Sequence, residues 1–198
     1  MNKVIIVGGG AAGMLASIIA AKNGCAVTLF EKNEKLGKKV YITGKGRCNV
    51  TNNCDPEELL QAVMSNQKFL YSAFYSFTSQ DMMQLLEDAG VPLKTERGNR
   101  VFPVSDHSSD IIHGLERLMK KYRVQIHLRS EVKNLLTENG IVTGIQLTDN
   151  KVYTADAVIV ATGGLSYPTT GSTGDGYRFA AETGHTVTEC MPSLVPLT

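Results

Sequence analysis

The segment from Val4 to Glu31 constrains the fold more than any other, because it has the order strand, glycine turn, helix, strand and acidic residue. Its first apolar run, Val4 to Val7, is too short for a helix and leads into the pattern Gly-x-Gly-x-x-Gly at Gly8, Gly10 and Gly13. In a dinucleotide-binding unit these glycines permit a tight turn, a close approach of pyrophosphate to the backbone, and close packing of helix on sheet. The helix that follows has free N–H groups at its N-terminus, which favour a phosphate.

The second half of this segment supports the same interpretation. Met14 to Asn23 is predicted to be helical and to end at Gly24, and Ala26 to Phe30 is predicted to be the second strand. Glu31 follows at nearly the spacing of about 20 residues at which an acidic side chain accepts hydrogen bonds from a ribose. Two alternatives remain: a βαβ unit without a ligand, and a Glu31 that is merely solvated at the end of its strand. The complete order of elements favours a dinucleotide site.

The same segment also resembles a membrane-spanning helix, because no charged residue lies between Val4 and Ala21. Lys3 in front of it imitates the basic start of a signal peptide. Its glycines and alanines lower its hydrophobicity, and another strand follows directly after Lys22 and Asn23. We therefore expect a cytoplasmic protein with no membrane partner.

Composition restricts the class of protein further. The chain has 198 residues, a net charge of +1, 42% hydrophobic and 20% charged residues, which is typical of a globular protein and gives no indication of a nucleic-acid partner. There is no Cys-x-x-Cys pair and no metal-ligand spacing of histidines, so we expect reduced cysteines and no metal site. The residues concerned are Cys25, Cys48, Cys54, Cys190, His107, His113, His127 and His185.

The part of the chain after Glu31 predicts a long loop and then a helical insertion over about residues 55–121. The loop, Lys32 to Asn53, is too long for a simple connection. Helices are expected from Pro56 onward, within Gln67 to Phe77, from Asp81 to Ala89 with Ser79 as cap, and from Asp110 to Tyr122 with Asp106 or Ser108 as cap. A short hairpin is expected from Leu93 to Thr95 and Arg100 to Phe102, around Gly98-Asn99.

Residues 124–155 predict strands without an intervening helix. Val124, Ile126 and Leu128 alternate with polar residues and suit a third strand of the main sheet. Three alternating runs follow, and the hairpin signals Asn139-Gly140 and Asp149-Asn150 separate them. These runs are Val132 to Leu136, Ile141 to Leu147 and Val152 to Thr154, and they predict an antiparallel meander over about residues 132–155.

The apolar run from Ala157 to Ala161 is typical of a buried parallel strand, and it ends at Thr162-Gly163-Gly164. Ordinary NAD-binding domains connect such strands with helices. A meander crossover before a strand that ends in Ala-Thr-Gly resembles the FAD-binding domain of the two-dinucleotide-binding flavoprotein superfamily. The expected fold is therefore α/β: a Rossmann-like FAD-binding domain with a β-meander crossover and a helical insertion.

Three loops have compositions that suit a ligand. The loop from Gly44 to Asn52 offers backbone N–H groups and the Arg47 guanidinium to a phosphate or to the polar edge of a flavin; the alternative is a solvated basic loop. Gly163-Gly164 follows the C-terminal end of a predicted strand, which is where open α/β sheets bind ligands. The turn from Gly171 to Gly176 is either an anion-binding turn or a site where Asp175 caps a helix from Tyr177 to Thr183. A solvated face is favoured for Lys32, Lys35, Lys38 and Lys39.

Five motifs carry a resemblance to a known family. In chain order they are Val7-Gly8-Gly9-Gly10-Ala11-Ala12-Gly13, Gly44-Lys45-Gly46-Arg47-Cys48-Asn49-Val50-Thr51-Asn52, Arg100-Val101-Phe102-Pro103, Ala161-Thr162-Gly163-Gly164 and Thr170-Gly171-Ser172-Thr173-Gly174-Asp175-Gly176. Together they resemble the BaiN-like family of NAD(P)/FAD-dependent oxidoreductases, which includes aminoacetone-oxidase-type enzymes. The second motif is far more specific than the first, which many flavoproteins share.

The resemblance implies a set of cofactor-binding residues. Gly8, Gly10, Gly13 and Glu31 would hold the ADP part of FAD. Arg47, Asn49 and Thr51 would lie along the pyrophosphate towards the flavin, the Val132 backbone would meet the adenine, and Gly163 would line the cofactor. The full predicted set is Gly8, Gly10, Ala12, Gly13, Glu31, Lys32, Gly37, Lys39, Gly46, Arg47, Asn49, Thr51, Val132, Ala161, Thr162, Gly163 and Asp175.

The resemblance also implies a function and a longer protein. Members of the family have a middle domain and a returning C-terminal segment, so we expect residues 1–198 to be an incomplete FAD-binding domain that a missing C-terminal half or a partner chain completes. The implied function is an FAD-dependent oxidoreductase that acts on a small molecule, with NAD(P)H as a candidate electron donor. The alternative is a non-catalytic dinucleotide-binding or redox-sensing module. A simple NAD-dependent dehydrogenase is disfavoured by the meander and by the absence of an obvious acid/base pair.

Overall fold

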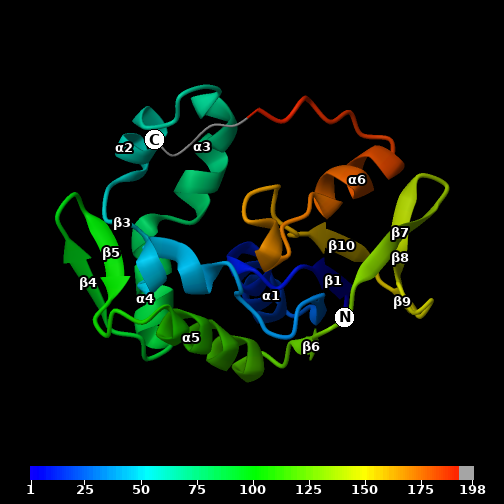
Figure 1. Cartoon of the computed structure of the whole chain (residues 1–198), viewed down its shortest axis with the longest axis horizontal. Coiled ribbons are helices and arrows are strands. Elements are labelled where there is room, and N and C mark those ends of the chain that lie inside the picture. The colour runs from blue at the N-terminus through cyan, green and yellow to red at the C-terminus, as the bar shows by residue number, and fades with distance from the viewer. Residues whose placement is uncertain (192–198) are drawn as a thin grey trace.

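The computed structural model describes residues 1–191 and contains a four-stranded parallel sheet at its centre (Figure 1). Its strands are β1 (Lys3–Val7), β2 (Ala26–Phe30), β6 (Gln125–His127) and β10 (Ala157–Val160), in the spatial order β10-β1-β2-β6. Helix α1 (Ala11–Lys22) connects β1 to β2 and begins three residues earlier than the sequence pattern predicts. The βαβ unit, the third strand next to β2 and the parallel strand next to β1 are confirmed.

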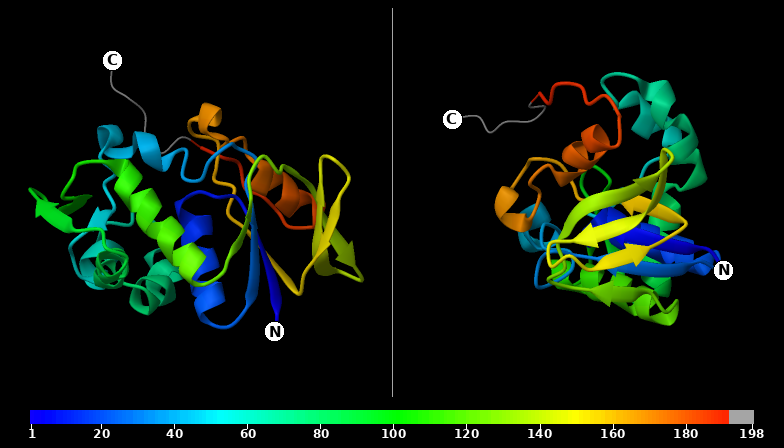
Figure 2. Two further views of the ribbon diagram at one scale, coloured as in Figure 1. Left: turned by 90° about the horizontal axis from the view of Figure 1, so that it is seen from below. Right: turned by 90° about the vertical axis from the view of Figure 1, so that its right-hand side faces the viewer.

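The sheet separates two hydrophobic cores, because successive residues of β1 point to opposite faces. Val4 and Ile6 face α1 and α5 (Ser108–Lys121), whereas Ile5 and Val7 face the other side. That second side is covered by β7 (Val132–Glu138), β8 (Ile141–Leu147) and β9 (Val152–Thr154), which form the predicted antiparallel meander. Figure 2 shows the meander and α5 at opposite sides of the sheet. Helix α6 (Asp175–Glu182) packs beside the meander through Phe179.

The prediction that the last parallel strand is buried is wrong. Among the strands of residues 1–191, β10 pairs with β1 alone, and Ile159 and Val160 are 40% and 38% exposed. An apolar run is typical of a strand that other elements cover on both faces. β10 is an edge strand with a neighbouring strand on one side alone, so its side chains are less covered than those of a central strand. The strand also ends at Val160, so Ala161 belongs to the loop that follows.

The predicted helical insertion contains three helices and a hairpin before α5. They are α2 (Pro56–Gln61), α3 (Gln67–Ser76), α4 (Ser79–Asp88), β4 (Leu93–Glu96) and β5 (Arg100–Pro103). The long loop before them is not irregular throughout. It contains the 3-10 segment η1 (Val40–Gly46) and the short strand β3 (Thr51–Asn52), which pairs with β5.

The predicted helix caps are wrong at three positions. Thr78, not Ser79, caps α4: its hydroxyl accepts from the Asp81 N–H at 3.1 Å, and the Asp81 carboxylate accepts from the Thr78 N–H at 2.8 Å. His107 precedes α5 without a side-chain cap, because Asp106 binds cations and the Ser108 hydroxyl donates to the Tyr41 carbonyl. Gly174 is the N-cap residue of α6, so of the two alternatives for the turn from Gly171 to Gly176 the Asp175 cap is wrong; the Asp175 carboxylate accepts from Lys32 and Thr173 instead. In each case a neighbour competes for the side chain.

No helix within residues 1–191 is both long enough and apolar enough to span a membrane. The uncharged run from Val4 to Ala21 is divided between β1, a turn and α1. Residues 192–198 lie outside the described residues.

Candidate functional site

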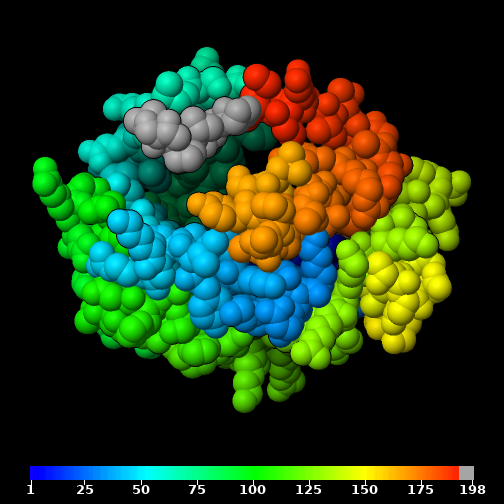
Figure 3. Space-filling model, in the orientation of Figure 1, coloured from blue at the N-terminus to red at the C-terminus, as the bar shows by residue number. Residues whose placement is uncertain are grey.

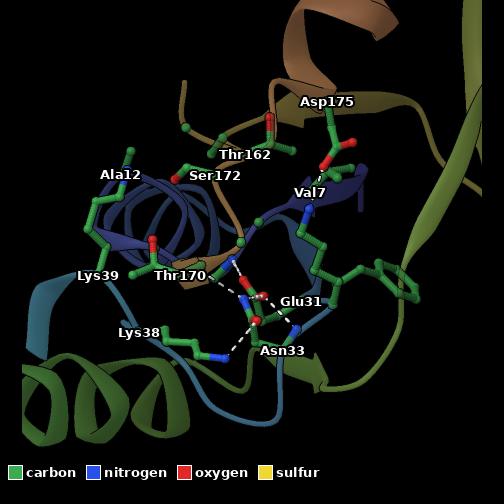
Figure 4. Close-up of a pocket in the computed structure, with 18 of the residues that line it drawn as sticks. Val7, Ala12, Glu31, Asn33, Lys38, Lys39, Thr162, Thr170, Ser172 and Asp175 are labelled. Carbon is green, nitrogen blue, oxygen red and sulfur yellow. Dashed lines mark hydrogen bonds and ion pairs between the residues drawn. The ribbon is translucent and has the colours of Figure 1, made fainter. Parts of the chain in front are cut away.

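A cavity of about 320 Å³ lies at the carboxyl ends of the parallel strands. Its walls come from the ends of β1, β2 and β10, the first turn of α1, the chain after β2 up to Thr43 in η1, the residues before and at the start of β7, and the segment that leads into α6. Figure 3 shows this last segment (orange) packed against the chain that follows β2 (blue). The cavity therefore lies where open α/β sheets bind their ligands, and Figure 4 shows its lining.

The first turn of α1 faces this cavity with its N–H groups free. Gly10 precedes the helix and has no side chain that could cap it, and the first turn contains no acidic residue. The first intrahelical bond runs from the Met14 N–H to the Gly10 carbonyl at 2.9 Å. Within residues 1–191 the N–H groups of Ala11, Ala12 and Gly13 bind no acceptor. Free N–H groups and the helix dipole make this turn suitable for an anion.

The three motif glycines are required for different reasons. A Cβ atom on Gly8 would lie 2.5 Å from the Ala161 carbonyl oxygen, and one on Gly13 would lie 1.8 Å from the Gly8 carbonyl oxygen. A Cβ atom on Gly10 would meet no atom within 4 Å. The packing of the chain therefore excludes side chains at Gly8 and Gly13, whereas the space beside Gly10 is open.

Glu31 is buried in the cavity wall, so the alternative of a solvated strand-end glutamate is wrong. Its Oε2 accepts from the Gly9 N–H at 2.6 Å. Its Oε1 accepts from the Asn33 N–H at 2.7 Å and from the Asn33 side-chain amide at 2.6 Å. Glu31 thus joins the glycine turn after β1 to the chain after β2. A carboxylate can accept further bonds, so the ribose role stays a prediction.

Lys32 is not part of a solvated face. Its ammonium group lies 2.7 Å from both the Asp175 carboxylate and the Thr173 hydroxyl, and only 23% of each charged side chain is exposed. Burial opposes ionisation of Asp175, but hydrogen bonds from Lys32 and Thr173 outweigh it and lower the pKa of the carboxyl group. The Asn33 amide also donates to the Thr170 carbonyl at 3.2 Å. These bonds tie the chain after β2 to the start of α6 across the cavity.

The cavity wall also contains residues outside the predicted cofactor set. They are Phe30, Asn33, Lys38, Ser130, Glu131 and Thr170, among others, together with Ser172 of the candidate turn from Gly171 to Gly176. Asn33 and Ser130 lie within two residues of predicted positions, but nothing in their local pattern separates them from ordinary loop residues. Thr162 was predicted, and its hydroxyl is buried without a hydrogen-bond partner within residues 1–191. Such an atom is costly unless a ligand or water completes it.

The structure brings most of the predicted cofactor residues together and leaves the others outside. Those that line the cavity are Gly8, Gly10, Ala12, Glu31, Lys32, Lys39, Val132, Ala161, Thr162, Gly163 and Asp175. Those outside it are Gly13, Gly37, Gly46, Arg47, Asn49 and Thr51. Gly13 lies beneath the glycine turn, and a Cβ atom on Gly37 would lie 2.9 Å from the Ile112 side chain, so both serve packing.

The loop from Gly44 to Asn52 contacts the β4–β5 hairpin through Arg47, Asn49 and Thr51. Oriented to satisfy its neighbours, the Asn49 amide donates to the Thr51 and Val101 carbonyls at 3.1 and 3.3 Å. The Thr51 hydroxyl lies 3.1 Å from that of Ser79, and burial raises the pKa of the Cys48 thiol. The cofactor role that the resemblance implies for these residues stays a prediction.

Comparison with known proteins identifies the family. The model of the HI0933-like protein Rossmann domain matches residues 2–191. The 3-dehydro-bile acid delta(4,6)-reductase of Clostridium scindens is 32% identical over 200 residues, which cover 100% of this chain and 47% of that protein. The ribosomal RNA dihydrouridine synthase of Haemophilus influenzae is 33% identical over 197 residues, which cover 98% of this chain and 48% of that protein.

A solved structure supports the fold. The open conformation of a flavocytochrome c3 fumarate reductase has a TM-score of 0.71 and 26% identity, and the match covers 92% of this chain and 40% of that one. The chain spans about half the length of the curated relatives it matches. These matches confirm the predicted family, that of the BaiN-like flavoprotein oxidoreductases. The chain belongs to the HI0933-like Rossmann domain family.

Proposed function

We propose that this chain binds FAD in the cavity and forms the cofactor-binding part of an oxidoreductase. The observation that carries the proposal is the open first turn of α1, where the fold leaves both the space beside Gly10 and the N–H groups of Ala11 and Ala12 free. FAD would supply the redox chemistry, since a flavin accepts and donates a hydride or an electron pair. The described residues would bind the cofactor, orient it and exclude water.

The donors and acceptors of the cavity fit a dinucleotide. The helix N–H groups suit the pyrophosphate, and Glu31 stands at the end of β2, where an acidic side chain meets a ribose. Val132 begins the meander at the same cavity, which supports its predicted contact with the adenine. FAD is favoured over NAD because a meander, not a helix, leads into β10.

We propose the electron donor and the substrate by chemical class only. NAD(P)H is a candidate donor, and a small molecule is the proposed substrate. The two relatives named above act on a bile acid derivative and on ribosomal RNA by their names, so substrates differ among proteins of this kind. The expectation that this chain has no nucleic-acid partner stays a prediction.

A non-catalytic dinucleotide-binding module is the second candidate. This candidate uses the same nucleotide-binding cavity: the chain would bind the dinucleotide there and pass no electrons to a substrate.

Calorimetric titration of the purified chain with FAD and, separately, with NAD tests the proposal. We expect FAD to bind and NAD to bind far more weakly; binding of NAD alone would overturn the assignment. Anaerobic addition of NADPH or NADH to the FAD complex then separates the two candidates. Loss of the oxidised flavin absorbance supports an oxidoreductase, whereas a flavin that stays oxidised with every donor supports the module.

A further inference from the structure

The Arg47 side chain is held on three sides at the β4–β5 hairpin. Its Nε donates to Asp106 Oδ1 at 2.8 Å, and one terminal nitrogen contacts both Glu96 and Asp106, the latter at 2.6 Å. Its guanidinium carbon lies 4.1 Å from the centre of the Phe102 ring. Because a guanidinium is a rigid planar fork, two carboxylates and a stacked ring together fix its position and its plane.

The charge of Arg47 is compensated where it lies. Lys94 completes a group of two cations and two carboxylates, with its Nζ 2.8 Å from Asp106 Oδ2 and 3.6 Å from Glu96 Oε1. The hydrogen bond from Arg47 lowers the pKa of Glu96, and those from Lys94 and Arg47 lower the pKa of Asp106. Both carboxylates are therefore ionised at neutral pH, and the group adds no net charge to the neighbouring cavity.

The loop that ends at Arg47 has an unusual backbone. Gly44, Lys45 and Gly46 have φ values of +56°, +58° and +87°, and Cys48 has +61°. The left-handed region is unfavourable for lysine and cysteine, so surrounding contacts must maintain this conformation. A Cβ atom on Gly44 would lie 2.9 Å from the Asn49 nitrogen, which shows how closely the loop folds on itself.

The other end of this loop forms part of the cavity wall. Val40 and Thr43 line the cavity, and the Thr43 hydroxyl donates to the Val40 carbonyl at 2.7 Å. Two backbone hydrogen bonds connect this part of the loop to Arg47 and Cys48. The Arg47 N–H donates to the Gly44 carbonyl at 3.2 Å, and the Cys48 N–H donates to the Thr43 carbonyl at 3.0 Å. A displacement of Arg47 would therefore be transmitted to Thr43.

We propose that Arg47 is a positioning residue, which anchors the loop from Val40 to Gly46 so that Val40 and Thr43 form one wall of the cofactor cavity. Arg47 acts through Glu96, Asp106 and Phe102, and it does not bind a phosphate of the cofactor. This inference rests on the proposed binding of FAD, and it differs from the pyrophosphate contact that the resemblance implies for Arg47.

Three variants of the full chain separate anchoring from phosphate binding: Arg47→Lys, Arg47→Gln and the double variant Glu96→Gln/Asp106→Asn. Anchoring requires both the planar guanidinium group and its two carboxylate partners. We therefore expect all three variants to weaken FAD binding by about fivefold or more. The dependence of log Kd on log salt concentration should stay that of the wild type, because no phosphate contact is lost. Lys151→Gln is the matched control, since it removes one cation from an exposed pair with Asp149 and should leave FAD affinity unchanged.

A phosphate ligand gives the opposite pattern. Arg47→Lys would then keep most of the affinity, Arg47→Gln would reduce the salt dependence, and the double variant would bind FAD at least as tightly as the wild type. Any of these results overturns the inference.

Amide hydrogen exchange of the chain without FAD provides a second readout. Loss of the anchor should accelerate exchange within residues 40–50 in Arg47→Lys and Arg47→Gln and leave α1 protected; unchanged exchange in both variants contradicts the inference. This measurement needs no cofactor. A wild-type chain that binds no FAD would overturn the proposed function, while the exchange data would still decide whether Arg47 anchors the loop.

Discussion

Substitution of Gly10 tests whether the open space beside α1 belongs to a cofactor. Gly10 has φ −78° and ψ −173°, a backbone conformation that any residue adopts, and a Cβ atom there meets nothing within 4 Å. Gly10→Ala gains about 0.4–1 kcal/mol from a less flexible unfolded chain and loses about 0.5–1 kcal/mol because alanine is a poor residue at a helix start. These terms nearly cancel, so the melting temperature should change by less than about 3 °C.

Gly10→Val should fold equally well and fail to bind FAD. The isopropyl group would occupy the space through which a pyrophosphate reaches the α1 N–H groups. Loss of two hydrogen bonds to a charged group, at about 1.5–3 kcal/mol each, corresponds to a decrease in affinity of about a hundredfold or more. Gly13→Ala is the contrasting variant, because its Cβ atom would lie 1.8 Å from the Gly8 carbonyl oxygen. It should lower the melting temperature even without FAD.

The assay combines thermal melting of the cofactor-free variants with calorimetric titration of FAD. The reasoning requires a normal melting temperature with lost binding for Gly10→Val, and a lowered melting temperature for Gly13→Ala. If Gly10→Val binds FAD with wild-type affinity, the pyrophosphate does not lie at α1. If Gly10→Val melts as early as Gly13→Ala, the space beside Gly10 is not open and the structural argument fails.

Three further predictions concern other parts of the molecule. Lys32→Ala should lower the free energy of unfolding by about 1 kcal/mol at neutral pH. Because the pKa of Asp175 is lowered in the folded state, the difference in stability between this variant and the wild type should disappear as pH falls below about 4. Urea titrations that give equal losses at pH 7 and pH 3 would refute this. Thr78→Ala should lower the free energy of unfolding by about 1 kcal/mol through loss of the α4 capping box and leave FAD affinity unchanged, which urea titration and calorimetry would check. Burial raises the pKa of Cys48, so a thiol reagent at pH 7 should label exposed Cys190 well before Cys48, and mass spectrometry that finds Cys48 labelled first would contradict this.

The elements that the sequence predicted well are those fixed by local pattern. The strand, turn and helix from Val4 onward and the hairpins at Asn139-Gly140 and Asp149-Asn150 depend on neighbouring residues, and all are present. Errors arose where a distant residue competes for a side chain. Ser79 is a good helix-capping residue by type, but its hydroxyl lies against Thr51, and Thr78 caps α4 instead.

The contacts across the cavity illustrate the same limit. The Lys32–Asp175 pair joins residues 143 positions apart, and the charge pattern around Lys32 is that of a solvated loop. Arg47 is similar, because its partners Glu96 and Asp106 lie 49 and 59 positions away. Neither pairing has a local signal, so the sequence identifies these residues as charged loop positions and the fold decides what they contact.

The glycine motif contains two kinds of information, which its pattern assigns to different positions and which the contacts in the structure separate. Gly8 and Gly13 are required by the fold itself, since a Cβ atom on either would overlap the backbone of this chain. Their presence indicates a tight strand–turn–helix unit and would do so without any ligand. Gly10 is different, because no atom of the described residues excludes a side chain there. The described residues therefore give no steric reason for a glycine at position 10, whereas a bound pyrophosphate would give one. For this reason Gly10 supports the proposed cofactor more strongly than the rest of the motif.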